Sequence, residues 1–129
     1  MTQITEDFVS FETAKLLKEK GFNEQVKSYY TESGLEGYML ALKATKNTEL
    51  DNGFISRPTI QMTMKWLREK EWFICIIPLV FYDGEKVSKF GYNIWADDNL
   101  EVDEFNTPVF YTYEDACNAA INYCLKYLN

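Results

Sequence analysis

The amino-acid sequence predicts an α+β fold in a single domain, and three observations support this fold class. Three segments show the apolar spacing of helices, and each carries a start or stop signal. Runs of branched and aromatic residues, typical of antiparallel strands, lie between them. The 129 residues are 47% apolar and 16% aromatic, which is enough for one packed core. We therefore expect the order α-β-β-α-β-β-α over residues 1–129, with helices packed mainly on one face of an antiparallel sheet.

The first predicted helix covers residues 11–20 and has a signal at each end. Ser10 can cap the free N–H groups of the first turn, and Gly21 provides the left-handed residue with which helices often end. Phe22 can then fold back onto Leu17. The inward side is expected to hold Phe11, Ala14 and Leu17.

A hairpin and a polar loop are predicted next. Two short runs, 28–31 and 38–42, are separated by turn residues, which indicates a hairpin. Polar and apolar residues alternate poorly there, so a helix over 38–44 stays open as an alternative. Residues 45–53 are rich in Asn, Thr, Asp and Gly, and we expect them to form a mobile loop.

The segment 56–70 predicts the middle helix. Ser56 is the expected cap, and Pro58 has a backbone angle that suits the first turn. Met62 and Trp66 form a second apolar ridge, so the apolar arc covers roughly 200°, more than a single core contact requires. Another element of the domain or a partner could cover this ridge. The first apolar stripe consists of Ile60, Met64 and Leu67, with Thr63 beside them.

Residues 72–82 give the strongest strand signal, and Asp83 with Gly84 predicts a tight reversal into 86–96. The first run is apolar at both alternating positions, so we expect both of its faces to be covered and the strand to be central. Pro78 cannot donate a hydrogen bond to a neighbouring strand, which predicts an edge, a bulge or a break there. The returning strand has a core face with Phe90, Tyr92 and Ile94, and a half-wet face with Lys89, Asn93 and Trp95.

The last third of the chain holds an acidic loop, 97–104, and the final helix. A calcium loop requires glycine at its sixth position, where Val102 stands, so we expect no metal there. Thr112 and Asp115 form an altered capping box, and the helix should end near Tyr127. Its buried side is expected to hold Tyr113, Ala116, Cys117, Ala120, Cys124 and Tyr127, with Ile121 and Leu128 adjoining.

The formal net charge of −7 disfavours nonspecific binding to nucleic acids. Residues 55–96 are the exception, with six Lys and Arg against four Asp and Glu, and they offer a local basic patch. No apolar run is long enough to span a membrane and no secretory signal is visible, so we expect a cytoplasmic protein without a membrane partner. An odd number of cysteines, three, indicates free thiols rather than a disulfide framework.

The sequence lacks the residues that common catalytic sites require. It contains no histidine, which excludes the Ser-His-Asp and Cys-His nucleophiles. No glycine-rich phosphate loop and no metal-ligand spacing occur. We therefore expect no catalytic residue, no cofactor and no metal, and a protein that is not an enzyme.

Two segments share residues at a constant offset of fifty. Residues 14–20, AKLLKEK, and 64–70, MKWLREK, have Lys, Leu, Glu and Lys in common, and each precedes a predicted hairpin. An αββ unit used twice with a closing helix would explain this. Surface Lys and Glu also coincide by chance on helices, and this second explanation stays open.

Three blocks of the sequence resemble a group of small uncharacterised proteins from gut Bacteroidota and their phages and mobile elements. The blocks are 8–22, 57–70 and 112–128, and together they cover a little over a third of the chain. All three are predicted helices, so the resemblance implies a shared architecture. It implies no activity, cofactor or binding residue.

These observations lead to one functional hypothesis and two alternatives. We expect a protein-interaction domain, with self-association as one form of it, and Met62, Trp66 and Trp95 as the candidate interaction surface. The first alternative is a small-ligand-binding or enzymatic domain, which requires a concave pocket with converging polar groups. The second is a nucleic-acid-binding module or an acidic mimic of nucleic acid.

Overall fold

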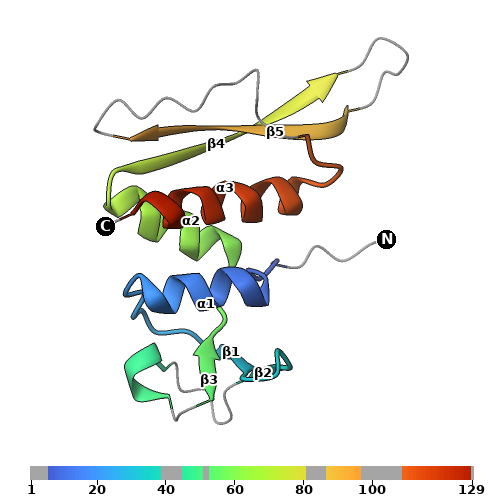
Figure 1. The fold of residues 1–129 in the computed structure, drawn as a ribbon. Helices are drawn as coiled ribbons and strands as arrows, with labels where there is room; N and C mark the ends of the chain where they lie inside the picture. Colours follow the sequence, from blue (N-terminus) through green and yellow to red (C-terminus); the bar gives the residue numbers. More distant parts are fainter. Residues whose placement is uncertain (1–5, 39–44, 51–52, 81–86, 97–108, 129) are drawn as a thin grey trace. The chain divides into compact units, whose positions relative to one another are not determined.

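The computed structural model describes residues 6–38, 45–50, 53–80, 87–96 and 109–128 (Figure 1). The chain divides into two compact units, residues 1–60 with 128–129, and residues 61–127. Three α-helices and two antiparallel sheets are present among the described residues, so the α+β prediction is confirmed. The elements in chain order are α1 (Phe11–Glu19), β1 (Ser28–Thr31), β2 (Glu36–Tyr38), the 3-10 helix η2 (Asn47–Glu49), β3 (Phe54–Ser56), α2 (Ile60–Glu69), β4 (Trp72–Val80), β5 (Val87–Ala96) and α3 (Tyr113–Tyr127).

Three predictions fall outside the described residues. They concern the choice between strand and helix beyond Tyr38, the reversal at Asp83 and Gly84, and the acidic loop 97–104. The predicted hairpin partner of β1 is β2, which begins at Glu36, two residues earlier than expected.

Both ends of α1 follow the sequence signals. The Ser10 Oγ accepts a hydrogen bond from the Thr13 N–H at 3.2 Å. At the other end Gly21 has φ of 91°, and the Phe22 N–H donates to the Leu17 carbonyl at 2.9 Å. Phe22 and Leu17 are both buried, so the chain folds back onto the helix as predicted.

The first unit contains the sheet β2–β1–β3. A buried asparagine connects strand β3 of this sheet to the chain that follows α1. Asn47 begins η2 within the predicted polar loop. Its Nδ2 donates to the Phe22 carbonyl at 2.8 Å, and its Oδ1 accepts from the Ser56 N–H at 2.8 Å. Residues 47–49 thus form a 3-10 turn within the segment where a mobile loop was expected, and the Asn47 side chain pairs two buried backbone groups there.

The predicted start of the middle helix is wrong. Ser56 is the last residue of β3 and pairs with Tyr29, so its backbone is extended, and α2 begins at Ile60. Pro58 keeps the residue before it out of the helical region, and Thr59 pairs with Phe8 in an isolated β-bridge, so the helix cannot begin before Ile60. Arg57, the residue before Pro58, is buried, and its guanidinium lies 3.9 Å from the centre of the Phe8 ring.

The apolar stripe of α2 agrees with the sequence pattern. Ile60, Met64 and Leu67 are buried, as is Thr63 beside them. Gln61, Lys65, Arg68 and Glu69 on the opposite side are exposed.

The second unit contains a two-stranded ribbon, β4–β5, and α3 lies along one of its faces (Figure 1). Thr112 caps α3 as predicted, since its Oγ1 accepts from the Asp115 N–H at 3.0 Å. Tyr113 and Tyr127 were expected to be buried but are 40% and 44% exposed. The buried side of α3 is Ala116, Cys117, Ala120, Ile121, Cys124 and Leu125.

Candidate interaction surface

Side chains of the β4–β5 ribbon alternate between two faces, as in any strand. On the inner face, toward α3, Tyr92 and Ile94 are buried and face Ile76 and Ile74 across the strands. The other face, which we call the outer face, carries these residues: Phe73, Cys75, Ile77 and Leu79 of β4, and Lys89, Gly91, Asn93 and Trp95 of β5.

The outer face is exposed at the end that carries Phe73, contrary to the prediction that both faces of residues 72–82 are covered, and it is more covered farther along, where Gly91 and the Asn93 Oδ1 are buried. Phe73 is 47% exposed, and Cys75 is exposed as well. Among the described residues β4 pairs with β5, and the central position expected for this strand stays a prediction. The register of the ribbon shifts between Leu79 and Val80, just after Pro78, which agrees with the bulge that was one of the three alternatives predicted there.

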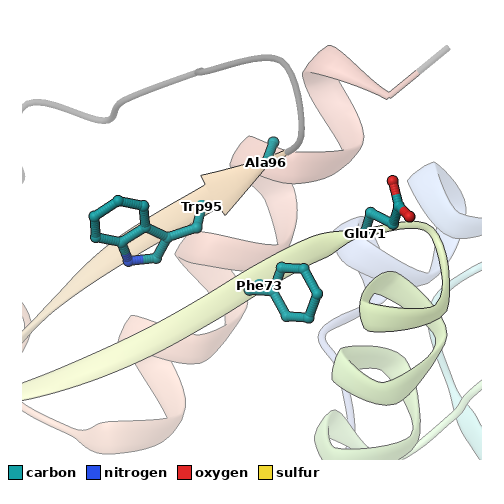
Figure 2. A pocket seen from close by; sticks show the side chains of 4 residues that line it. All are labelled: Glu71, Phe73, Trp95 and Ala96. Carbon is teal, nitrogen blue, oxygen red and sulfur yellow. The ribbon is translucent and has the colours of Figure 1, made fainter.

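Phe73 and Trp95 form an aromatic pair at one end of the outer face. They stand directly opposite each other in the antiparallel register, and Trp95 is 60% exposed. Together with Glu71 and Ala96 they line an open hollow of about 300 Å³, which we call the Trp95 hollow (Figure 2). Both strands that supply the rings are held from behind by α3. The backbone beneath the hollow is thus packed against α3 on its other face.

Glu71 lies at the edge of the Trp95 hollow, in the turn between α2 and β4 (Figure 2). It has φ of 68°, a left-handed conformation, and it is the one non-glycine residue with positive φ among the described residues. Its N–H donates to the Arg68 carbonyl at 2.9 Å, which ends the helix. A residue with a Cβ is disfavoured in this conformation by about 1 to 2 kcal/mol. Glycine would avoid that strain but would supply no carboxylate.

The far end of the outer face carries another exposed ring. Phe110 pairs with Phe90 of β5 through two backbone hydrogen bonds of 2.7 and 2.8 Å. This pairing places Tyr111 beside Lys89, whose Nζ lies 5.7 Å from the centre of the Tyr111 ring. The ring therefore has a cation of its own chain as a neighbour.

The three residues predicted as an interaction surface are not equally exposed. Trp66 is only 7% exposed, and the Lys70 Nζ lies 4.7 Å from its ring centre. Met62 is 38% exposed on α2. Trp95 keeps the largest exposed fraction and is the one residue of the three that lines the Trp95 hollow.

The sequence reasoning missed Phe73 and Glu71. Phe73 stands in an apolar run that was interpreted as covered on both sides, although its register against the half-wet face of residues 86–96 was a usable signal. The offset of fifty places Glu71 where the first helix has Gly21, and this contrast was the available signal for a strained turn.

No group of three or more His, Cys, Asp or Glu residues is arranged to hold a metal ion within the part of the chain that the structure describes. Within the same part, no helix has the length and apolar character needed to cross a membrane. Comparisons of this chain with protein-family models, with curated proteins and with solved structures give no match.

Proposed function

We propose that this protein is a protein-interaction module that binds a protein partner through the outer face of the β4–β5 ribbon. The observation that carries the proposal is the pair Phe73 and Trp95, two large exposed side chains at directly paired positions of β4 and β5. Exposed aromatic patches on soluble proteins commonly mark interaction sites. Tryptophan is also among the residues that contribute most to binding energy at interfaces.

The construction of the ribbon supports this role. The inner face is packed, with Tyr92 and Ile94 buried and α3 alongside. A surface whose backbone is already ordered loses little conformational entropy when a partner binds, so more of the contact energy contributes to affinity.

The charge supports a protein rather than a nucleic acid as partner. Residues 61–127 contain six Lys and Arg against eleven Asp and Glu, which repels phosphates. Arg57, part of the basic patch expected from the sequence, is buried. Self-association is the form of the proposal in which the partner is a second copy. We place the interaction in the cytoplasm, in agreement with free thiols at all three cysteines.

The proposal is tested with three baits coupled to beads: the wild-type protein, the double variant Phe73→Ala/Trp95→Ala, and Leu35→Ala. Leu35 is 67% exposed in the first unit and serves as a matched control for loss of an exposed apolar side chain. Circular dichroism establishes that all three are folded. We expect a protein that the wild type and Leu35→Ala retain from lysate equally, and that the double variant retains about tenfold less.

Sedimentation velocity over a range of concentrations tests the same variants for self-association. A dimer that only the double variant loses would identify the partner as a second copy. Equal retention of every captured protein by the three baits, with no change in sedimentation, would refute the proposed surface.

A further inference from the structure

We propose that the outward edge of β4, the side that faces away from β5, receives an extended strand from another protein, which adds to the ribbon by backbone hydrogen bonds. This inference rests on the proposed function and names the form in which the partner binds, since the added strand would lie beside Phe73. Three features of β4 support it: the direction of its backbone groups, the partial cover of its side chains, and the absence of charge along its length.

The backbone of Phe90 fixes the direction of the backbone groups along the ribbon. Its N–H and its carbonyl both bond to Phe110, at 2.7 and 2.8 Å, so neither group points toward β4. Phe90 stands opposite Pro78, which has no N–H to donate. The pair Pro78 and Phe90 is therefore a pair without hydrogen bonds between β4 and β5.

Pairs with and without hydrogen bonds alternate along an antiparallel ribbon. The arrangement at Pro78 therefore repeats two and four residues earlier, at Ile76 and Ile74, since the register is continuous between them. The N–H and the carbonyl of both isoleucines point along the outward edge of β4. Within the described part of the chain, no backbone group outside the ribbon bonds to them. Two donors and two acceptors are thus aligned as in the edge strand of an open sheet.

The side chains of β4 are covered less than those directly opposite on β5. On the inner face Tyr92 and Ile94 are 6% and 2% exposed, whereas their partners Ile76 and Ile74 are half-buried. On the outer face Phe73 is exposed. An added strand has side chains on both of its faces, so it would cover the two isoleucines and also lie against Phe73. A helix laid on one face would leave the backbone groups of the edge unpaired.

The outward edge of β4 lacks the usual protection against pairing with another chain. Natural edge strands carry charged side chains, prolines or bulges that prevent such pairing. From Trp72 to Val80 the strand has no charged residue. Its proline and its register shift both lie in its last third, at residues 78–80. We therefore expect the added strand to pair with residues 72–76 and to be apolar on the side that meets the isoleucines.

Amide hydrogen exchange, measured by NMR, tests whether this edge is open in the free protein. The N–H groups of Phe73 and Cys75 point toward β5 and should exchange slowly. Those of Ile74 and Ile76 should exchange at least about tenfold faster in a dilute sample. Slow exchange of all four in dilute protein would mean that the chain covers the edge itself. Slow exchange of the isoleucines only at high protein concentration would mean that a second copy occupies it. Either result would overturn the inference.

Titration with a synthetic strand tests the kind of occupant. The probe is the peptide Lys-Val-Thr-Val-Thr-Val-Lys with blocked ends, whose β-branched residues favour an extended chain. Two further peptides carry N-methyl groups, one on its valine nitrogens and the other on its threonine nitrogens. Every second N–H of a strand faces the same neighbour, so only one of the two methylated sets should interrupt the pairing.

We expect the unmodified peptide to slow exchange at Ile74 and Ile76 and to leave Phe73 and Cys75 unchanged. One methylated peptide should bind about tenfold more weakly than the other, because it has lost the N–H groups that bond to β4. Equal binding of the two methylated peptides would overturn the inference, as would an unmodified peptide that does not slow exchange at the isoleucines.

A pair of variants tests the same edge from the protein's side. Ile76→Pro removes an outward N–H and keeps the hydrogen bonds between β4 and β5, as Pro78 does two residues later. Ile76→Ala shortens the side chain but keeps the N–H, so it is the matched control. The peptide should bind Ile76→Pro about fivefold more weakly than Ile76→Ala, and equal affinities would contradict strand addition. Slow exchange at Phe73 and Cys75 establishes that the ribbon is intact. If Ile76→Pro does not fold, the methylated peptides decide the question on the wild type.

The outcomes separate strand addition from the proposed function. If the peptide fails while Phe73→Ala/Trp95→Ala still loses a captured protein, the outer face is an interaction surface and strand addition is wrong. If the peptide binds as expected and no bait loses a protein, the proposed function fails and the outward edge of β4 is a strand-binding site alone.

Discussion

The two helix-and-strand segments of this chain begin alike and end differently. Their helices share Lys, Leu, Glu and Lys at an offset of fifty, and each is followed by a residue with positive φ. After α1 that residue is Gly21, and the strands beyond it are tied by the buried side chain of Asn47. After α2 it is Glu71, and the strands beyond it expose Phe73 and Trp95.

This difference indicates that the residues of the first segment favour the stability of the fold, whereas some residues of the second segment reduce it. The strained backbone of Glu71 and the exposed rings of Phe73 and Trp95 are each unfavourable for folding. All three residues line the same hollow. Local choices that disagree with the fold are expected at functional sites, where another requirement decides the residue. The contrast between the two segments can be tested at each of its parts.

The largest effect is expected at Asn47 in the first segment. Asn47→Ala removes two buried hydrogen bonds and leaves the Phe22 carbonyl and the Ser56 N–H without their partner. The free energy of unfolding should fall by about 3 kcal/mol, measured by urea denaturation with far-UV circular dichroism. Thr48→Ala, an exposed neighbour, should change it by less than about 0.5 kcal/mol. Equal effects of the two variants would show that Asn47 does not tie the first segment together.

The second effect tests how tightly α3 closes the inner face of the ribbon. Burial raises the pKa of the Cys124 thiol from 9.0 to about 12, because the thiolate is disfavoured away from water. The unfolded chain loses this proton above pH 9 while the folded chain keeps it, so stability is complete below pH 9 and falls as the pH rises toward 12. The expected loss is about 2 kcal/mol between pH 7 and pH 10.5.

Urea denaturation at a series of pH values measures this loss, and the variants isolate the thiol responsible for it. Cys124→Ala should show about 2 kcal/mol less change with pH than the wild type. Cys75→Ala, at an exposed position, should keep the wild-type pH dependence. A Cys124→Ala protein with an unchanged pH dependence would mean that the inner face admits water.

The third effect compares the two helix ends directly. Gly21→Ala should lower the free energy of unfolding by about 1 kcal/mol, because a Cβ at φ of 91° strains the backbone although it meets no neighbouring atom. Glu71→Gly should raise it by about 1 kcal/mol, because it removes the same strain. Both are measured by urea denaturation at pH 7. A loss of stability in Glu71→Gly would show that the left-handed turn is not the strained part of the second segment.

Local signals predicted the helices well, because caps and stops act over three or four residues. Ser10, Gly21 and Thr112 all stand where the sequence placed them. Ser56 misled because a capping residue and the end of a strand have the same extended backbone, and only the pairing of β3 with β1 distinguishes them. Pairing between distant strands is not encoded in a local pattern.

The candidate site was only partly predictable for the same reason. Alternation in residues 86–96 placed Trp95 on the half-wet face, and it is exposed. The run that contains Phe73 is apolar at every position and gives no face by itself, so Phe73 could be placed only through its register against residues 86–96. The helical spacing placed Met62 and Trp66 on the same apolar ridge and did not distinguish their exposure. In the structure only Trp66 of the two is buried. Whether a side chain is covered depends on elements distant in sequence.

The smallest effect on stability is expected at Cys75, and it tests whether the outer face is open. Cys75 is two residues from Phe73 on β4, so the two side chains share a face, and its thiol is exposed while Cys117 and Cys124 are buried. A thiol reagent should modify one cysteine per folded chain and three in denaturant. Cys75→Thr should remove the fast reaction and change the free energy of unfolding by less than about 0.5 kcal/mol. A folded chain in which no thiol reacts would mean that the outer face is covered, and the aromatic pair would then be core rather than surface.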